Sequence, residues 1–126
     1  MRQIVLDLVR VAKVLVSDEP MTFEEPSNHT KRWAKTNLML ALRVDNSWKQ
    51  IYESFLTFQE GSSNKFHYFS VWKSKTGECV GGNAFGRIGY NPKGFEIARG
   101  NESSVMSAVR GKESVKRSNG YQTTEV

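Results

Sequence analysis

Residues 65–90 read KFHYFSVWKSKTGECVGGNAFGRIGY, and their pattern predicts two antiparallel strands. Aromatic side chains alternate along residues 65–73, and in an extended chain they fall on opposite faces. One face receives Phe66, Tyr68, Ser70 and Trp72, and the other receives His67, Phe69 and Val71. Because both faces carry aromatic rings, this segment is predicted to be a central strand covered on both sides. KTGE at 75–78 is typical of a tight hairpin turn, so residues 79–90 are predicted to return beside it.

Shorter segments extend this hairpin into a sheet. YESFLTFQE, residues 52–60, is predicted to be a strand in which Phe55 is opposite in phase to Leu56 and Phe58. GSSN at 61–64 is interpreted as the turn that follows. After the central hairpin, NPKG at 91–94 predicts a second turn and residues 95–99 a further short strand.

Residues 100–121 have the start and stop signals of a helix. Ser103 or Ser104 is expected to cap it, and Gly120 suits a left-handed residue at its end. Its apolar stripe is expected to comprise Val105, Ala108, Val109 and Val115. The predicted fold is therefore α+β, an antiparallel sheet with one main C-terminal helix packed on it.

The first 47 residues give weaker signals and are treated as an N-terminal extension of uncertain structure, with a folded domain at 48–126. Residues 17–30 contain two prolines and polar residues typical of a loop, in which His29 is expected to be solvated. KRWAKTNLMLALRV, residues 31–44, has leucines at 38, 40 and 42, and this period of two favours a strand.

Composition limits the class of protein. A chain of 126 residues with 38% hydrophobic and 25% charged residues is typical of one soluble globular domain. The sequence has no run of about 18 apolar residues, so no membrane span is predicted. Asp7, Arg10 and Lys13 interrupt the apolar start, which argues against a signal peptide. An intracellular protein is therefore expected. The single cysteine, Cys79, allows no internal disulfide and is interpreted as a buried hydrophobe, and His67 as a partly buried strand histidine.

Positive charge is confined to the second half of the chain. Residues 1–61 hold eight Lys/Arg and eight Asp/Glu, whereas residues 62–126 hold ten Lys/Arg and five acids, which accounts for the whole net charge of +5. A positive field on one half suggests an anionic partner, most commonly nucleic acid. Lys112, Lys116 and Arg117 lie near one end of the predicted helix, where long basic side chains reach a phosphate backbone.

Residues 83–90, NAFGRIGY, combine an aromatic ring and a guanidinium between glycines. In a strand, Phe85 and Arg87 fall on the same face. Arg87 offers a planar fork of donors that matches phosphate oxygens, and Phe85 offers a ring for stacking. Gly86 and Gly89 let another backbone approach closely.

With these elements placed, the chain resembles the WGR domain, a module of poly(ADP-ribose) polymerases and of small bacterial proteins. The resemblance covers about residues 50–124 and rests on three motifs in the expected order. They are an Asn-Lys-aromatic strand start at Asn64, the pentapeptide FGRIG at 85–89, and a basic helix end with Gly-Tyr at 120–121. The chain departs from the family in having Phe85 where the naming tryptophan is expected, a longer turn after GRIG, and no counterpart for residues 1–47.

This resemblance implies binding of double-stranded DNA at ends or nicks that carry a 5′ phosphate. It implies that Phe85 stacks on the terminal sugar or base and that Arg87 reaches the phosphate. Asn64 and Tyr121 are then expected to complete a phosphate pocket, with Lys65 of the same motif beside it. Donors of these types commonly position phosphates.

Other interpretations of the same residues remain open from sequence. Phe85 is also compatible with an ordinary core position, Arg87 with an ion pair to Glu78 or Glu96, and the glycines with a bulge. A protein-interaction module is the alternative function, because WGR-like surfaces also dock neighbouring domains. An enzyme is not expected. GKES around Lys112 lacks the upstream glycine of a P-loop, and neither a metal-binding set of residues nor a nucleophile beside a base is evident. No cofactor is predicted.

Overall fold

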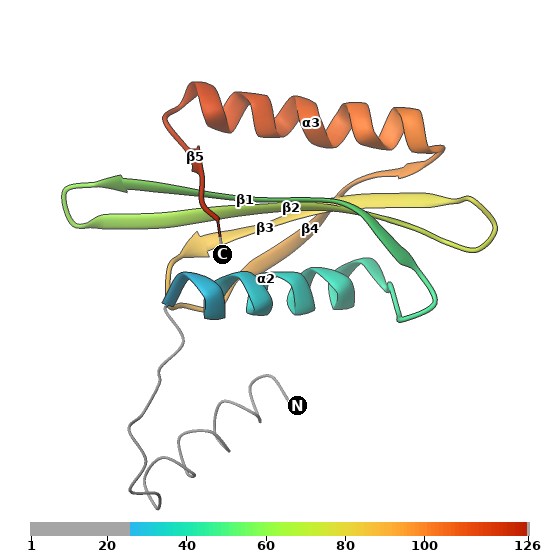
Figure 1. Cartoon of the computed structure of the whole chain (residues 1–126), viewed down its shortest axis with the longest axis horizontal. Coiled ribbons are helices and arrows are strands. Elements are labelled where there is room, and N and C mark those ends of the chain that lie inside the picture. The colour runs from blue at the N-terminus through green and yellow to red at the C-terminus, as the bar shows by residue number, and fades with distance from the viewer. Residues whose placement is uncertain (1–25, 126) are drawn as a thin grey trace, which may run out of the picture.

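The computed structural model describes residues 26–125, which form two helices and a five-stranded antiparallel sheet. The elements are α2 (Pro26–Leu42), β1 (Lys49–Glu60), β2 (Ser63–Lys73), β3 (Cys79–Arg87), β4 (Lys93–Gly100), α3 (Glu102–Ser118) and β5 (Gln122–Thr123). The strand order is β4-β3-β2-β1-β5, and the two helices cover opposite faces of the sheet (Figure 1). The predicted α+β fold with a C-terminal helix on the sheet is confirmed.

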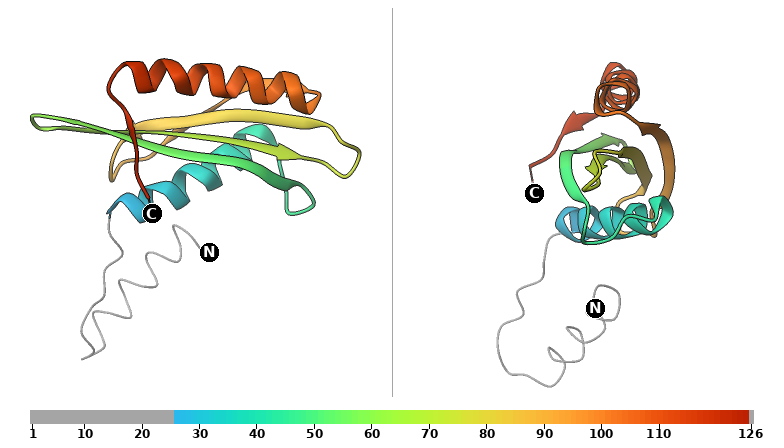
Figure 2. Two further views of the ribbon diagram at one scale, coloured as in Figure 1. Left: turned by 45° about the horizontal axis from the view of Figure 1, so that its top comes forward. Right: turned by 90° about the vertical axis from the view of Figure 1, so that its right-hand side faces the viewer.

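Strand β2 lies at the centre of the sheet, as its alternating aromatic pattern predicts. It pairs with β3 without interruption from Lys65 opposite Arg87 to Lys73 opposite Cys79. On one face of the sheet Phe66, Tyr68 and Trp72 share a core with α2. On the other face Phe69 and Val71 share a core with Val105 and Val109 of α3 and with the buried Cys79. The end-on view in Figure 2 shows the sheet enclosed between α3 and α2.

The strand expected at residues 31–44 is wrong, because most of this segment belongs to α2. The polar residues 26–30, expected to be loop, form its first turns, and His29 lies there against the Trp33 ring. The buried residues recur every four positions along α2, with exposed fractions of 0–1%: Thr30, Ala34, Leu38 and Leu42. Leu40, the middle leucine of the supposed alternation, is 73% exposed. This four-residue spacing is that of a helix face packed on a core, so residues 26–42 fold as one body with the sheet.

Two adjacent glycines in β3 let both helices approach the sheet closely. A Cβ on Gly81 would lie 2.6 Å from Cγ2 of Val109 in α3. A Cβ on Gly82 would lie 2.9 Å from Cδ1 of Leu38 in α2 and 2.5 Å from the backbone oxygen of Phe95. Because successive residues of a strand face opposite sides, one Gly-Gly pair accommodates a helix on each face.

The N-cap of helix α3 lies two or three residues before the predicted serine caps. Asn101 is its N-cap, and its Oδ1 accepts a hydrogen bond from the backbone N–H of Ser104 (2.9 Å). At the other end, the N–H of Gly120 donates to the Arg117 carbonyl and that of Tyr121 to the Lys116 carbonyl, both at 3.1 Å. Gly120 has a φ of +102°, so the predicted left-handed glycine is confirmed. This turn directs Tyr121 back toward the sheet.

The apolar stripe of α3 differs from the predicted one at a single position. Val105 and Val109 are buried as expected, but Val115 is 59% exposed and Glu113 is buried in the helix face instead. Neither helix among residues 26–125 is long and apolar enough to cross a membrane.

Candidate functional site

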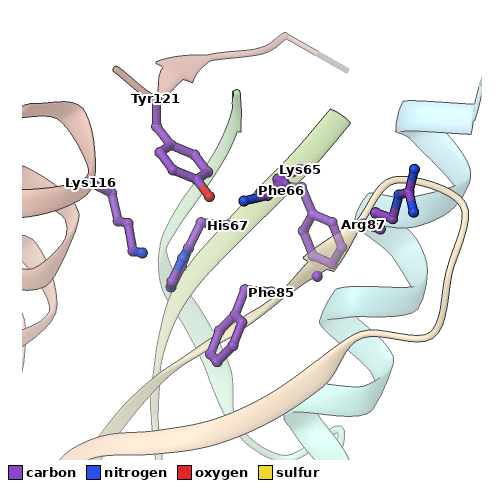
Figure 3. Close-up of a pocket in the computed structure, with 8 residues that line it drawn as sticks. Lys65, Phe66, His67, Phe85, Arg87, Lys116 and Tyr121 are labelled. Carbon is purple, nitrogen blue, oxygen red and sulfur yellow. The ribbon is translucent and has the colours of Figure 1, made fainter. Parts of the chain in front are cut away.

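A hollow of about 200 Å³ opens on the α3 face of the sheet, beside the C-terminal part of the helix. We name it the Arg87 hollow. Figure 3 shows Tyr121 and Lys116 directed toward the strands, with Arg87 at the opposite end of the group from Lys116. Its lining residues are Lys65, Phe66, His67, Phe85, Gly86, Arg87, Lys116 and Tyr121.

Two cross-strand pairs form the floor of this hollow. Lys65 of β2 lies opposite Arg87 of β3, and His67 lies opposite Phe85. Residues directly opposite one another in an antiparallel pair share a face, so two cations and two rings are placed side by side. The expectation that Phe85 and Arg87 belong to one face agrees with this register.

Beside the cations runs a continuous series of rings, which we name the aromatic row: Phe69, His67, Phe85 and Phe95. Their successive centroid distances are 4.5, 4.9 and 5.6 Å, with interplanar angles of 14°, 25° and 24°. Tyr121 meets the His67 ring edge-on at 6.2 Å and is itself stacked on Phe58 at 5.3 Å. The row begins at a fully buried ring and ends at an exposed one, because Phe69 is 0% and Phe95 is 51% exposed.

His67 joins the aromatic row as a neutral ring. Its Nε2 lies 2.6 Å from Oδ1 of Asn83, an acceptor, so Nε2 carries the proton of this hydrogen bond. Burial lowers the pKa of His67 to about 4, and the charges of Lys116 and Lys112 add to that effect while the Asn83 bond opposes it. Asn83 in turn donates from Nδ2 to the backbone carbonyl of Phe95 (3.3 Å). One amide thus fixes the orientation of His67 and the position of the strand that carries Phe95.

A second hollow, of about 190 Å³, adjoins the first between α3 and the sheet, and we name it the Asn83 hollow. Lys112, Val115 and Lys116 form its helix side, and His67, Phe69 and Asn83 form its floor. Lys116 therefore borders both hollows, and its Nζ lies 5.3 Å from the centroid of the Tyr121 ring. Arg87 lies 5.5 Å from the centroid of the Tyr90 ring at the other end of the site.

The cations of this face are not held in ion pairs within residues 26–125. Three carboxylates of the second half are engaged elsewhere, in the pairs Lys73–Glu102, Arg99–Glu96 and Arg117–Glu113. Among residues 26–125, Lys65, Arg87, Lys112 and Lys116 have no carboxylate within ion-pair distance. Their charges are therefore left to act on an incoming anion.

The structure gathers most of the residues that the sequence singles out. Lys65, Phe85, Arg87, Lys116 and Tyr121 line the Arg87 hollow, and Lys112 lines the adjacent Asn83 hollow. Asn64 does not join them, because it alternates with Lys65 and belongs to the opposite face of β2. Its side-chain oxygen accepts from Gln59 (3.4 Å), while its backbone carbonyl accepts from Ile88 (2.9 Å) and so holds the rim of the hollow.

Arg117 is also separated from the site, because it is bound to Glu113. Its Nη2 lies 2.7 Å from Oε2 of Glu113 and 2.7 Å from Oγ1 of Thr123 in β5. The hydroxyls of Tyr52 and Ser54 donate to the same carboxylate. Burial raises the pKa of Glu113, but these hydrogen bonds and the Arg117 charge outweigh it and hold the pKa below its usual range. This cluster fastens α3 to β1 and β5.

The alternatives left open for residues 83–90 can now be compared with the geometry. Phe85 is 36% exposed and so is not a core residue. Glu96 pairs with Arg99, and Arg87 instead lies against Tyr90. The β2–β3 register passes through Gly86 without a bulge. Gly89 has a φ of +90° in the turn that follows, and its N–H donates to Oγ1 of Thr30 in α2 (3.0 Å).

Asn83, Phe95 and Lys93 belong to this face but were not recognised in the sequence. Lys93 lies directly opposite Phe85 in the β3–β4 pair, and Phe95 lies opposite Asn83. A strand at residues 95–99 was predicted, and pairing it with β3 in the correct register would have identified these three residues. Its register was not available, because β4 carries an irregularity between the partners of Gly81 and Gly82.

Comparison of the chain with protein-family models, with curated proteins and with solved structures found no match. The chemistry of the site thus rests on its own residues. They form a row of stacked rings that ends at two exposed ones, with cations that have no carboxylate partner among residues 26–125 beside it, which suits an anion attached to a planar group.

Proposed function

We propose that this protein is a non-enzymatic nucleic-acid-binding module that binds double-stranded DNA at ends or nicks, inside the cell. The observation that carries the proposal is that cations without a carboxylate partner among residues 26–125 gather beside the exposed rings of the aromatic row, at one face of the sheet. Phosphates supply the negatively charged partners that these cations lack. Sugars and bases supply the flat surface that stacks on a ring.

Each residue of the Arg87 hollow has a role in this proposal. The Arg87 guanidinium binds the 5′ phosphate through its fork of donors, and Lys65, opposite it in the sheet, adds a second charge. Phe85 stacks on the terminal sugar or base. The Tyr121 hydroxyl, at the wall formed by the turn after α3, donates to a phosphate oxygen. Lys112 and Lys116 attract the flanking backbone without regard to its end.

The preference for a 5′-phosphorylated end is supported by the WGR resemblance of residues 64–121. Of the residues that carry the resemblance, Lys65, Phe85, Arg87 and Tyr121 line the Arg87 hollow. Asn64 and Arg117 have other partners, so we assign them to the support of the site and not to contact with DNA.

Docking of a partner protein is a second candidate, and one observation favours it. Phe95 and Val115 are 51% and 59% exposed on this same face, and exposed apolar groups are typical of protein interfaces. Salt separates the two candidates. Binding to DNA weakens steeply with added salt because condensed counterions are released, whereas docking through apolar groups changes little.

The test is an equilibrium titration with four labelled probes of one sequence. They are a linear duplex with and without a 5′ phosphate, a nicked duplex, and a relaxed closed circle. We expect phosphorylated ends and nicks to bind most tightly, with a steep salt dependence. Equal affinity for the circle and the phosphorylated linear duplex at matched salt would contradict the end preference. Lys75→Ala is the matched control, since Lys75 lies in the turn at the far end of the β2–β3 hairpin.

A further inference from the structure

The aromatic row extends beyond the Arg87 hollow. Phe85 lines that hollow, but Phe95 does not, and it lies on the neighbouring strand β4. Its ring is nearly parallel to that of Phe85, at 24°, and is 51% exposed. The surface that receives the terminal nucleotide in the proposed function thus continues by one more ring.

The position of Phe95 is fixed by buried groups. Asn83, 8% exposed, donates to the Phe95 carbonyl and accepts from His67, and His67 is stacked on Phe85. Both exposed rings are therefore held in register by one buried amide and one buried imidazole. A platform that is ordered before binding loses little conformational entropy when a base stacks on it.

Cations lie on both sides of this extension. Lys93 is the cross-strand partner of Phe85 on β4, and Lys112 lines the Asn83 hollow on the helix side. A strand of nucleic acid that follows the aromatic row from Phe85 to Phe95 passes between them. The spacing of charge beside rings is the arrangement by which single-strand binders hold a backbone and stack its bases.

Phe85 is stacked between His67 and Phe95, so among residues 26–125 the ring face left open at this end of the aromatic row is that of Phe95. Such a face selects for unpaired bases. Within a duplex each base is stacked between its neighbours, so its face is not accessible to a side chain. Aromatic side chains on a sheet stack two or three unpaired bases in other nucleic-acid-binding domains. In a complex with DNA, a second exposed ring beyond the end-binding hollow is therefore a site for unpaired nucleotides.

We propose that Phe95, at the open end of the aromatic row beside Phe85, stacks on the first unpaired nucleotide, so that the preferred ligand is a DNA end with a short single-stranded extension. This inference rests on the proposed function, because the hollow holds the phosphorylated end from which the extension departs. Phe95 is then the residue that distinguishes an extended end from a blunt one.

The experiment compares two fluorescent hairpin duplexes, each with a single open end that carries a 5′ phosphate. One end is blunt and the other has three unpaired nucleotides, with 2-aminopurine at the first of them. We expect the extended end to bind at least about fivefold more tightly and its 2-aminopurine fluorescence to be quenched on binding, since base–aromatic stacking contributes that much per base. Phe95→Ala should abolish the preference for the extended end and the quenching, whereas Phe95→Trp should retain both.

Leu40→Ala is the matched control, because Leu40 is also exposed and apolar but lies on α2, which covers the other face. The inference would be overturned by equal affinity of the parent protein for the two ends, or by a Phe95→Ala protein that keeps the preference. In either case, binding to the blunt phosphorylated end would still support the proposed function. A protein that binds single strands and no duplex end would overturn the proposed function and keep the stacking on Phe95.

Discussion

His67 and Phe85 face each other across β2 and β3 with ring centroids 4.9 Å apart, and the pair joins the interior of the protein to its exposed aromatic surface. His67 is 5% exposed and is held by Asn83, whereas Phe85 is 36% exposed. Substitutions on the two sides of this contact should therefore have separable effects. Those at His67 should act on the stability of the fold, and those at Phe85 on what the surface binds.

Phe85→Ala is expected to weaken DNA binding with only a moderate loss of stability. It removes ring contacts with His67 and Phe95, each worth about 0.5–1.5 kcal/mol, and leaves the core intact. Phe66→Ala, at a ring 1% exposed, is the matched comparison and should cost about 3–5 kcal/mol. Phe85→Trp should keep or strengthen binding, because indole has more area for stacking. Thermal melts beside the titrations check both effects, and a Phe85→Ala protein that melts as low as Phe66→Ala would return Phe85 to a structural role.

Arg87→Ala is expected to lose affinity mainly for 5′-phosphorylated DNA. The side chain is exposed and contacts the Tyr90 ring, a contact worth about 0.5–1 kcal/mol, so melting should be almost unchanged. Arg87→Lys should recover only part of the loss, because an ammonium lacks the bidentate fork. The measurement is the ratio of affinities for phosphorylated and unphosphorylated ends. If this ratio stays at the parent value in Arg87→Ala, Arg87 does not bind the terminal phosphate.

Lys112→Ala and Lys116→Ala are each expected to weaken every DNA probe about equally. Both side chains line the helix wall of the Asn83 hollow without a carboxylate partner among residues 26–125, and they act as point charges on the backbone. The slope of log K against log salt should fall by about 1 in each variant. A loss restricted to phosphorylated ends would instead assign that lysine to recognition of the terminal phosphate.

Arg117→Ala is expected to destabilise the fold and not to change DNA specificity. It removes the charged donor that lies 2.7 Å from the buried Glu113 carboxylate, and hydrogen bonds to charged groups contribute about 1.5–3 kcal/mol. Denaturant unfolding measures the loss. In the double variant Arg117→Met, Glu113→Gln the loss should be smaller than the sum of the two single losses, because the carboxylate and its partner disappear together. Additive losses would show that the pair is not coupled.

The stability of the protein is expected to fall as the pH decreases from 6.5 to 5. The pKa of His67 is about 4 in the folded protein and about 6.5 in the unfolded chain, so in this interval the unfolded state binds the extra proton. The full difference of about 3 kcal/mol would be reached only near pH 4. Glu113 keeps its charge throughout the interval from pH 6.5 to 5, because its hydrogen bonds hold its pKa below the usual range despite burial.

The check is a series of thermal melts between pH 5 and 7.5 in a His29→Gln background, where His67 is the only histidine. His67→Phe in that background should remove most of the pH dependence in this interval. A slope that survives the substitution would assign the effect to other groups.

Local pattern was sufficient to predict the central hairpin and the C-terminal helix. The alternation of residues 65–73, the turn at 75–78 and the glycine at 120 each restrict the backbone through nearby residues alone. The short motifs around Phe85 and Tyr121 likewise pointed to one face of the sheet before any contact was known. These features are local in sequence, and so the sequence alone determined them.

Tertiary packing decided the rest. Leu38, Leu40 and Leu42 fit a strand by their alternation, and only burial against the sheet shows that Leu38 and Leu42 share a helix face while Leu40 is solvent-exposed. Arg117 became part of a structural cluster because α3 presents it, together with Glu113, to β1 and β5. Asn83 and Phe95 joined the site through the register of β3 and β4, which an irregularity shifts by one residue. A register and a helix face depend on partners distant in the chain, so the one-dimensional pattern does not contain them.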